Sequence, residues 1–200
     1  MYQKRGRGEA MATGPRSRVP FKRRKDGKTN YRRRLALVKS GKDRVVIRKS
    51  LNNILIQIVS STFEGDKTLT TAFSKELRDM GWNFHCGNTP SAYLTGYLCG
   101  KRAKKIADEF ILDIGLQRSI KGGRNYAALK GFVDAGCNVN VDESIFPPEN
   151  RVKGENISSY YEGLDESLKE KNFSNYLKNK TDPSKMPGMF EEIKTKIDKL

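Results

Sequence analysis

Residues 44–59 read RVVIRKSLNNILIQIV, and their pattern is the strongest indication of the fold in this chain. Its first part, 44–49, is β-branched and flanked by charge, whereas in its second part Ile54, Ile56 and Ile58 recur at every other position. Such alternation is typical of strands with one apolar face. Residues 50–53 between the two parts predict a tight hairpin connection. A third strand, 68–73, follows the turn residues Glu64-Gly65-Asp66, so we expect a three-stranded antiparallel meander.

After the meander the pattern changes to helix, strand and helix. Thr89 fits the N-cap and Pro90 the first position of a helix that we expect to run to about Asp108. A stripe of small residues at helical spacing suits this helix for close packing on a sheet: Ala92, Gly96, Cys99, Gly100, Ala103 and Ala107. The apolar run 110–115 predicts a strand covered on both faces, and 127–135 predict a second helix with Gly136 as its C-cap. This β-β-β-α-β-α order favours the α/β class, with β-α units continuing the meander into a mixed sheet with packed helices.

Segments of different composition flank this core. Residues 1–28 are rich in Gly, Pro, Lys and Arg without periodicity, which is typical of a chain that is disordered in isolation. Asn30 is suited to cap a short helix over 31–39 that ends at Ser40-Gly41. Beyond Pro147-Pro148 the chain is polar, and helices are expected at 157–171 and 188–200. The expected division is an extra N-terminal extension (1–10), a basic arm with its short helix (11–40), an α/β core domain (41–142) and a helical C-terminal extension (143–200).

The charge of the chain is concentrated at its N-terminus. Of its 39 Lys and Arg residues, 18 lie in the first 50 positions, against three acids, so that this segment carries +15 of the total charge of +16. The remaining 150 residues, with 21 bases and 20 acids, are nearly neutral. A cationic arm on an ordinary globular body predicts a polyanionic partner, most commonly nucleic acid.

Other function classes find little support. No stretch approaches the roughly 20 apolar residues of a membrane span, and the arm lacks the apolar face of a membrane-surface helix. The N-terminus has no secretory apolar segment. Three widely spaced cysteines indicate reduced thiols, so we expect an intracellular protein without a membrane partner.

The sequence offers little catalytic or metal-binding chemistry. His85 is the only histidine, which excludes a His-based triad or a multi-His metal site within one chain. The carboxylates of Asp108, Glu109, Asp113 and Asp134 leave a metal-dependent nuclease as an alternative. We favour a structural role for Asp113, as a hydrogen-bond acceptor for a neighbouring loop, because the first three strand cores contribute no acid. No catalytic residue, metal site, cofactor or small-molecule substrate is predicted.

The loop 119–124 precedes a helix and contains Lys121-Gly122-Gly123-Arg124. Its backbone N–H groups and two cations could hold a phosphate, although the spacing of a nucleotide-binding P-loop is missing. A solvated turn is an equally good interpretation.

Nucleic-acid features form the stronger set. Cations that could contact phosphate are spaced through the arm and continue onto the first strand, and such contacts give affinity rather than sequence readout. Phe21 and Tyr31 are candidates to stack on unpaired bases or to anchor the arm to the core. The predicted RNA-binding residues are Arg16, Arg18, Phe21, Lys22, Arg23, Arg24, Lys25, Lys28, Asn30, Tyr31, Arg32, Arg33, Arg34, Arg44, Arg48, Lys49, Ser50, Asn52, Asn53, Lys121 and Arg124.

Specific motifs in this chain resemble a known family. The most specific is Gly87-Asn-Thr-Pro-Ser-Ala-Tyr-Leu-Thr-Gly96, followed by Leu112-Asp-Ile-Gly-Leu-Gln-Arg118. Further matches are Met11-Ala-Thr-Gly-Pro-Arg16, Val19-Pro-Phe-Lys-Arg-Arg24, Thr29-Asn-Tyr-Arg32, Ala128-Leu-Lys-Gly131 and Ile145-Phe-Pro147. Together they resemble archaeal members of the universal large-subunit ribosomal protein family that binds 5S rRNA, ribosomal protein L-eighteen, called L-five in eukaryotes. Residues 1–10 have no counterpart in the family pattern, and Leu51-Asn52-Asn53 stands where related sequences favour a more polar, often basic stretch.

The resemblance implies a non-enzymatic, structural constituent of the large ribosomal subunit in the cytoplasm. It implies binding of 5S rRNA and its attachment to large-subunit rRNA in the central protuberance, beside neighbouring large-subunit proteins. It also implies that the N-terminal arm and the first strands face RNA. The alternatives are a general basic RNA- or DNA-binding module and the metal-dependent nuclease.

Overall fold

A five-stranded mixed sheet forms the centre of the protein, whose computed structural model describes residues 14–15, 19–179 and 181–200. The strands are β1 (Asp43–Lys49), β2 (Ile54–Ser61), β3 (Asp66–Phe73), β4 (Glu109–Asp113) and β5 (Asn138–Val139). Their order is β3-β2-β1-β4-β5, with antiparallel pairing from β1 to β3 and parallel pairing from β1 to β5. The predicted meander and mixed sheet are therefore confirmed.

The alternation in the β1–β2 hairpin creates an apolar and a polar face. Ser50 closes the hairpin, where its backbone N–H donates to the carbonyl oxygen of Asn53 at 2.8 Å. The apolar face consists of side chains that are at most 1% exposed, namely Val45, Ile47, Ile54, Ile56 and Ile58. The polar face therefore includes Arg44 and Arg48, which alternate with this set along β1.

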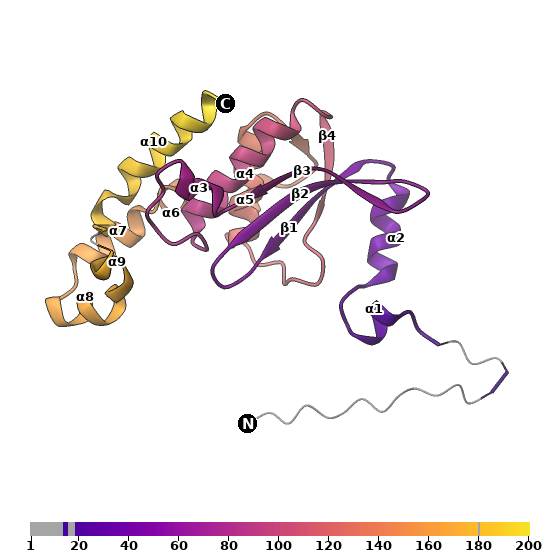
Figure 1. The fold of residues 1–200 in the computed structure, drawn as a ribbon, viewed down its shortest axis with the longest axis horizontal. Coiled ribbons are helices and arrows are strands. Elements are labelled where there is room, and N and C mark those ends of the chain that lie inside the picture. Colours follow the sequence, from indigo (N-terminus) through magenta and orange to yellow (C-terminus); the bar gives the residue numbers. More distant parts are fainter. Residues whose placement is uncertain (1–13, 16–18, 180) are drawn as a thin grey trace.

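Helices α4 (Thr89–Ala103) and α5 (Arg124–Asp134) cover the apolar face of the sheet (Figure 1). The small residues of α4 were expected to pack on the sheet, but Gly96 faces α5 instead. A Cβ at Gly96 would overlap the backbone of Ala128, and one at Gly131 would overlap the backbone of Tyr93. The two helices therefore contact each other backbone to backbone, because glycine alone leaves room for that approach.

The two predicted ends of α4 and the burial expected for β4 need correction. Asn88, not Thr89, caps α4, since its Oδ1 accepts the backbone N–H of Ser91 at 2.9 Å. This helix ends at Ala103 rather than near Asp108, and a cationic turn leads from its end to β4. Strand β4 is fully covered only at Phe110 and Asp113, because its neighbour β5 is just two residues long and leaves much of its edge open.

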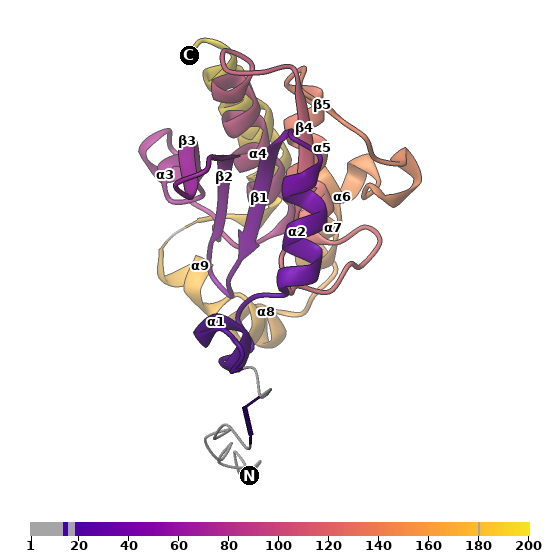
Figure 2. The same cartoon turned by 90° about the vertical axis from the view of Figure 1, so that its right-hand side faces the viewer.

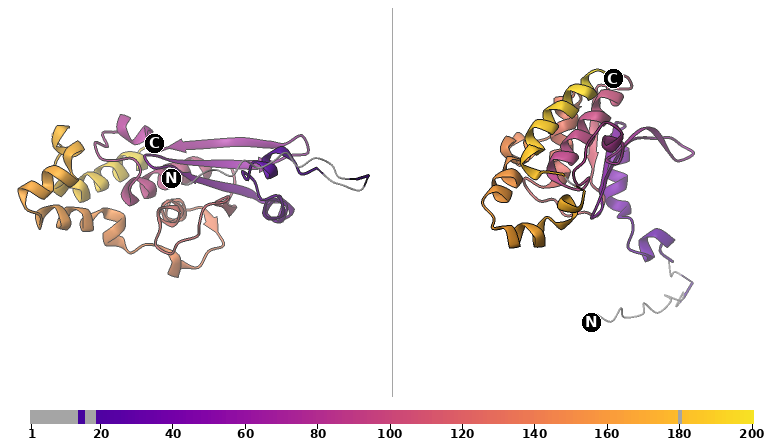
Figure 3. Two further views of the ribbon diagram at one scale, coloured as in Figure 1. Left: turned by 90° about the horizontal axis from the view of Figure 1, so that it is seen from below. Right: turned by 60° about the vertical axis from the view of Figure 1, so that its left-hand side comes forward.

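The C-terminal part divides into more helices than expected. They are α6 (Glu149–Lys153), α7 (Glu155–Glu162), α8 (Glu166–Asn172), α9 (Ser174–Lys178) and α10 (Met186–Asp198). The predicted helix over 157–171 is broken at residues 163–165, at a glycine that ends α7. Helix α10 runs alongside α4 (Figure 3), and Phe190, Ile193 and Ile197 are buried in the same hydrophobic cluster as the sheet. The end of this chain therefore completes the core.

Candidate nucleic-acid interface

Helix α2 (Tyr31–Lys39) lies on the polar face of the sheet, opposite α4 and α5 (Figure 2). Asn30 caps it as predicted, because its Oδ1 accepts the backbone N–H of Arg33 at 3.1 Å. No residue of α2 is buried. Instead, polar contacts dock the helix, with Arg33 donating to the carbonyl oxygen of Gly115 at 3.2 Å and Arg34 paired with Asp66 at 2.8 Å. A helix held in this way leaves most of its cationic surface exposed.

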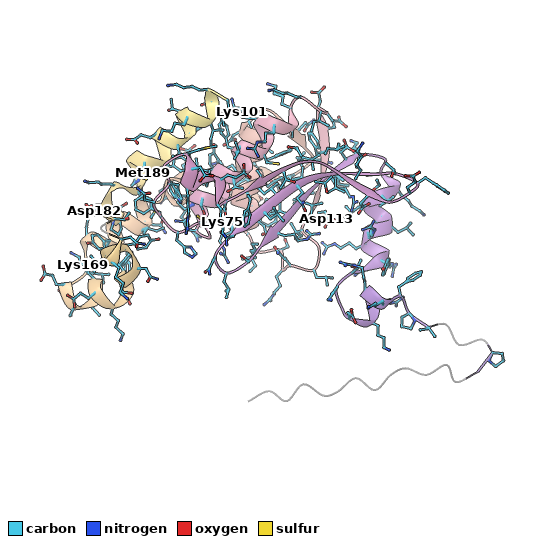
Figure 4. The ribbon with its side chains drawn as sticks, in the orientation of Figure 1. Lys75, Lys101, Asp113, Lys169, Asp182 and Met189 are labelled. Atoms are coloured by element: carbon cyan, nitrogen blue, oxygen red, sulfur yellow. The ribbon has the colours of Figure 1, made fainter. Side chains whose placement is uncertain are left out.

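Two aspartates hold the arginines on the polar face. Arg44 is 2% exposed, and its guanidinium lies 2.7 Å from the carboxylate of Asp66 and 3.5 Å from that of Asp113. Arg48 pairs with Asp113 at 3.1 Å and also donates to the backbone carbonyl oxygen of that residue at 2.7 Å. We name these residues, with Arg34, the arginine–aspartate network. Figure 4 labels Asp113 at its centre, between the sheet and α2.

The network explains both carboxylates without catalysis. Asp113 Oδ1 accepts the backbone N–H of Gly115 at 2.7 Å, so the predicted hydrogen bond to a neighbouring loop is confirmed. Burial raises the pKa of Asp66, but its hydrogen bonds and ion pairs with Arg44 and Arg34 outweigh burial and lower that pKa overall. Asp66 is therefore charged at neutral pH and pairs with two cations.

Other candidate acids lie apart from this network. Asp134 accepts the Tyr93 hydroxyl at 2.7 Å, and Glu109 pairs with Lys42. Within the described ranges, no three His, Cys, Asp or Glu side chains gather as metal ligands would. In the same part of the chain, no helix combines the length and apolarity that a membrane span requires.

The arm meets the body through a short helix and an aromatic pair. Helix α1 (Lys22–Lys25) is exposed throughout, as are Lys28, Arg32 and Arg33. The rings of Phe21 and Tyr31 lie 5.1 Å apart and tilted by 46°, so they contact each other rather than the core. Phe21 remains 70% exposed. Arg16 and Arg18 lie outside the described residues.

Residues predicted to bind RNA at the β1–β2 turn already make hydrogen bonds within the protein. Ser50 and Asn53 bond to each other, and Asn52 Oδ1 lies 3.4 Å from the His85 ring. Arg124 donates to the carbonyl oxygen of Gly87 at 2.5 Å and reaches that of Ser50 at 3.5 Å. This arginine therefore ties the turn to the start of α4.

The glycine loop before α5 offers neither glycine N–H group to a phosphate. Gly122 donates its N–H to Ile145, and Gly123 donates to Ile120. Of the two open interpretations, the geometry favours a turn that presents the exposed Lys121.

Sequence reasoning missed the segment that faces α2 from the sheet. Gly115, Leu116 and Gln117 follow β4 and line a cleft with residues of α2 and the arm. A usable signal was present, because these residues lie within the motif Leu112-Asp-Ile-Gly-Leu-Gln-Arg118. The structure places them at the carboxyl edge of the sheet, where the parallel strands β1 and β4 end. Gly115 has a φ of 60°, the left-handed conformation that turns the chain toward α2.

Two comparisons with known proteins identify the family. Residues 15–110 match the family described as ribosomal large subunit proteins 60S L5 and 50S L18. The large ribosomal subunit protein uL18 of Methanothermobacter thermautotrophicus (strain Delta H) is 49% identical over 189 residues, which cover 94% of this chain and 98% of that protein. An identity of this level over nearly the whole length extends to both the α/β core and the C-terminal helices. The chain therefore belongs to the uL18 family of large ribosomal subunit proteins.

Proposed function

We propose that this chain binds 5S rRNA and helps to attach it to large-subunit rRNA in the central protuberance. As a member of its family, it is a structural ribosomal protein that works in translation with rRNA and other ribosomal proteins as its partners. Its place is the large ribosomal subunit in the cytoplasm. The finer assignment, to 5S rRNA, rests on the surface formed by the arm, α2 and the polar face of the sheet.

One observation carries the proposal: three acids at this surface, Asp26, Asp66 and Asp113, already have cationic partners. Asp66 and Asp113 are neutralised by the arginines they hold, and Asp26 lies 3.6 Å from Lys28. The exposed cations of α1 and α2 therefore dominate the local potential. Such a surface attracts phosphate strongly and discriminates by shape, as proteins that bind folded RNA do.

The predicted residues take different roles in this proposal. The exposed cations from Lys22 to Arg33 contact phosphates, as do the exposed Lys121 and the half-buried Lys49. Arg44 is buried, so it positions Asp66 and Asp113 instead of contacting RNA. Arg124 likewise orders the β1–β2 turn, and Phe21 with Tyr31 offers an aromatic pair to an unpaired base. In domain terms, residues 11–40 are the RNA-binding arm, 41–142 the core and 143–200 the extension.

Salt-dependent binding tests the assignment. We expect the full chain to bind 5S rRNA in preference to a random RNA duplex of equal length, with an affinity that falls steeply as salt rises. Removing residues 1–28, which ends before the cap of α2, lowers both affinity and salt slope, and the slope falls by roughly 0.7–0.9 for each phosphate that the truncated chain no longer binds. Circular dichroism checks that the truncated chain stays folded.

A matched pair of variants separates this surface from general cationic attraction. Lys22→Ala with Arg24→Ala removes two charges from α1, whereas Lys171→Ala with Lys178→Ala removes two from α8 and α9 at the far end of the molecule (Figure 1). We expect about a tenfold loss for the first pair and less than twofold for the second. Equal losses, or equal affinity for 5S rRNA and the duplex, would support a general basic module instead.

A further inference from the structure

A cleft of about 400 Å³ lies between the arm, α2 and the chain that follows β4. We name it the Gln117 cleft, and its main lining residues are Arg23, Lys28, Asn30, Arg33, Leu116 and Gln117. Its volume falls in the range of sites that take a small organic molecule, roughly 300–1,000 Å³. A phosphate group alone would leave most of that space unfilled.

Among the described residues that line this cleft, the cations keep N–H donors that make no hydrogen bond within the protein. Its one acid, Asp113, is engaged by Arg44, Arg48 and the N–H of Gly115. Arg23 donates from Nε to Thr29 Oγ1 at 2.9 Å, and Arg33 donates to a single carbonyl oxygen. A guanidinium carries five N–H donors, so most of those on the two arginines remain for an anion.

The same cleft contains a buried acceptor that lacks a donor. Gln117 Nε2 donates to the carbonyl oxygen of Lys49 at 3.2 Å, which fixes the orientation of the amide. Its Oε1 is buried and has no hydrogen-bond partner among the described residues. Buried acceptors are almost always paired in folded proteins, so this shielded oxygen gains a partner when a small shift of the Gln117 side chain exposes it to a ligand N–H in the cleft.

We propose that the cleft receives one nucleotide unstacked from the bound RNA, an inference that rests on the proposed function. The phosphate of this nucleotide lies against Arg23, Lys28 and Arg33. Its base enters between Leu37 and Leu116, where a ring N–H or amino group donates to Gln117 Oε1. Sequence-specific RNA recognition commonly uses bases splayed out of the stack in this way.

A coupling experiment tests the base and the amide together. The probes are 5S rRNA molecules that each lack the base at one unpaired position, measured by filter binding with the full chain and with Gln117→Leu. We expect one abasic RNA to bind about tenfold more weakly, and Gln117→Leu to cost about tenfold on the intact RNA but less than twofold on that abasic RNA.

Two further variants guard against simple misfolding. Leu116 is 54% exposed, so Leu116→Trp leaves the core intact while it fills the cleft, and it too loses affinity for intact RNA only. Arg33→Ala is compared with Arg32→Ala, its neighbour on α2 outside the cleft, and the Arg33 variant loses at least threefold more. Melting temperatures confirm that each variant is folded.

The outcomes separate this inference from the proposed function. If 5S rRNA is preferred but every abasic position and Gln117→Leu act independently, no base occupies the cleft and the inference is wrong. It is equally wrong if Arg33→Ala alone has an effect, because the cleft then takes only a phosphate. If the full chain shows no preference for 5S rRNA over the duplex, the proposed function fails and the inference falls with it.

Discussion

Replacing Gly96 by alanine tests the backbone contact between α4 and α5. The added Cβ would overlap the carbonyl oxygen of Ala128 and lie 2.7 Å from its carbonyl carbon. Carbon atoms in contact normally stand about 3.5–4.0 Å apart, so the helices must separate by about 1 Å. Because the obstacle is backbone, no side chain can rotate away to relieve the overlap.

The magnitude follows from two opposing effects. Overpacking costs about 1–3 kcal/mol, and the backbone obstacle places Gly96→Ala at the upper end. Alanine recovers about 1 kcal/mol of helix propensity, which leaves a net loss of about 2 kcal/mol in the free energy of unfolding. For a chain of this size the melting temperature then falls by about 4–8 °C.

Gly188→Ala is the matched control for this substitution. Gly188 is also helical, but apart from its chain neighbours and the backbone of its own helix no atom lies within 4 Å of the position its Cβ would take. The same change of residue is therefore expected to raise the melting temperature, by up to about 4 °C. Thermal unfolding followed by circular dichroism measures both variants. If the two shifts have the same sign, the close approach of α4 and α5 does not exist as described.

The remaining predictions concern the arginine–aspartate network and the buried thiols. Arg44→Met leaves Asp66 and Asp113 without a buried partner, so we expect the free energy of unfolding in urea to fall by about 3 kcal/mol. Arg48→Met, at a half-exposed site, should lower it by only about 1 kcal/mol. Equal losses would contradict the burial of Arg44. The pKa of Asp66 is lowered below its usual 3.8, so its charge stabilises the fold above that pH, and this contribution is lost as the pH falls further. Between about pH 5 and pH 3, Asp66→Asn should therefore lose less free energy of unfolding than the unchanged protein does. Burial raises the pKa of the Cys99 thiol to about 12 and that of Cys137 to about 11, so iodoacetamide at about pH 8 alkylates both only after unfolding, and their modification in the folded chain, seen by mass spectrometry, would show an open core.

The sequence predicts well those elements whose signal is local. Ile54, Ile56 and Ile58 alternate without interruption, so the hairpin and its apolar face follow from period alone. Asn30 predicts the start of α2 because an N-cap hydrogen bond is made within the first turn of the helix. The small residues of α4 likewise predict a close approach, but they carry no information on whether a sheet or another helix makes it.

The site depends on contacts between residues distant in the chain, which the sequence does not specify. Arg44 has the appearance of a surface cation at the edge of a strand. Only the pairing of β1 with β2 and β4 brings Asp66 and Asp113 to it and closes it from solvent. Gln117 likewise gains its place beside the arm from the parallel pairing of β1 and β4. The distribution of charge along the sequence therefore predicts the cationic region, but it does not predict that Asp66 and Asp113 order this region.

The arginine–aspartate network gives the two parts of the cationic surface different kinetic roles. Arg34 and Arg48 have already lost their side-chain freedom to the aspartates, so RNA that contacts them loses little further rotamer entropy. The cations of α1 lie on an exposed segment, so in addition to contacting phosphates they contribute to the field that draws RNA toward the protein. Substitutions in α1 should therefore slow association, whereas those that free the pinned arginines should shorten the lifetime of the complex.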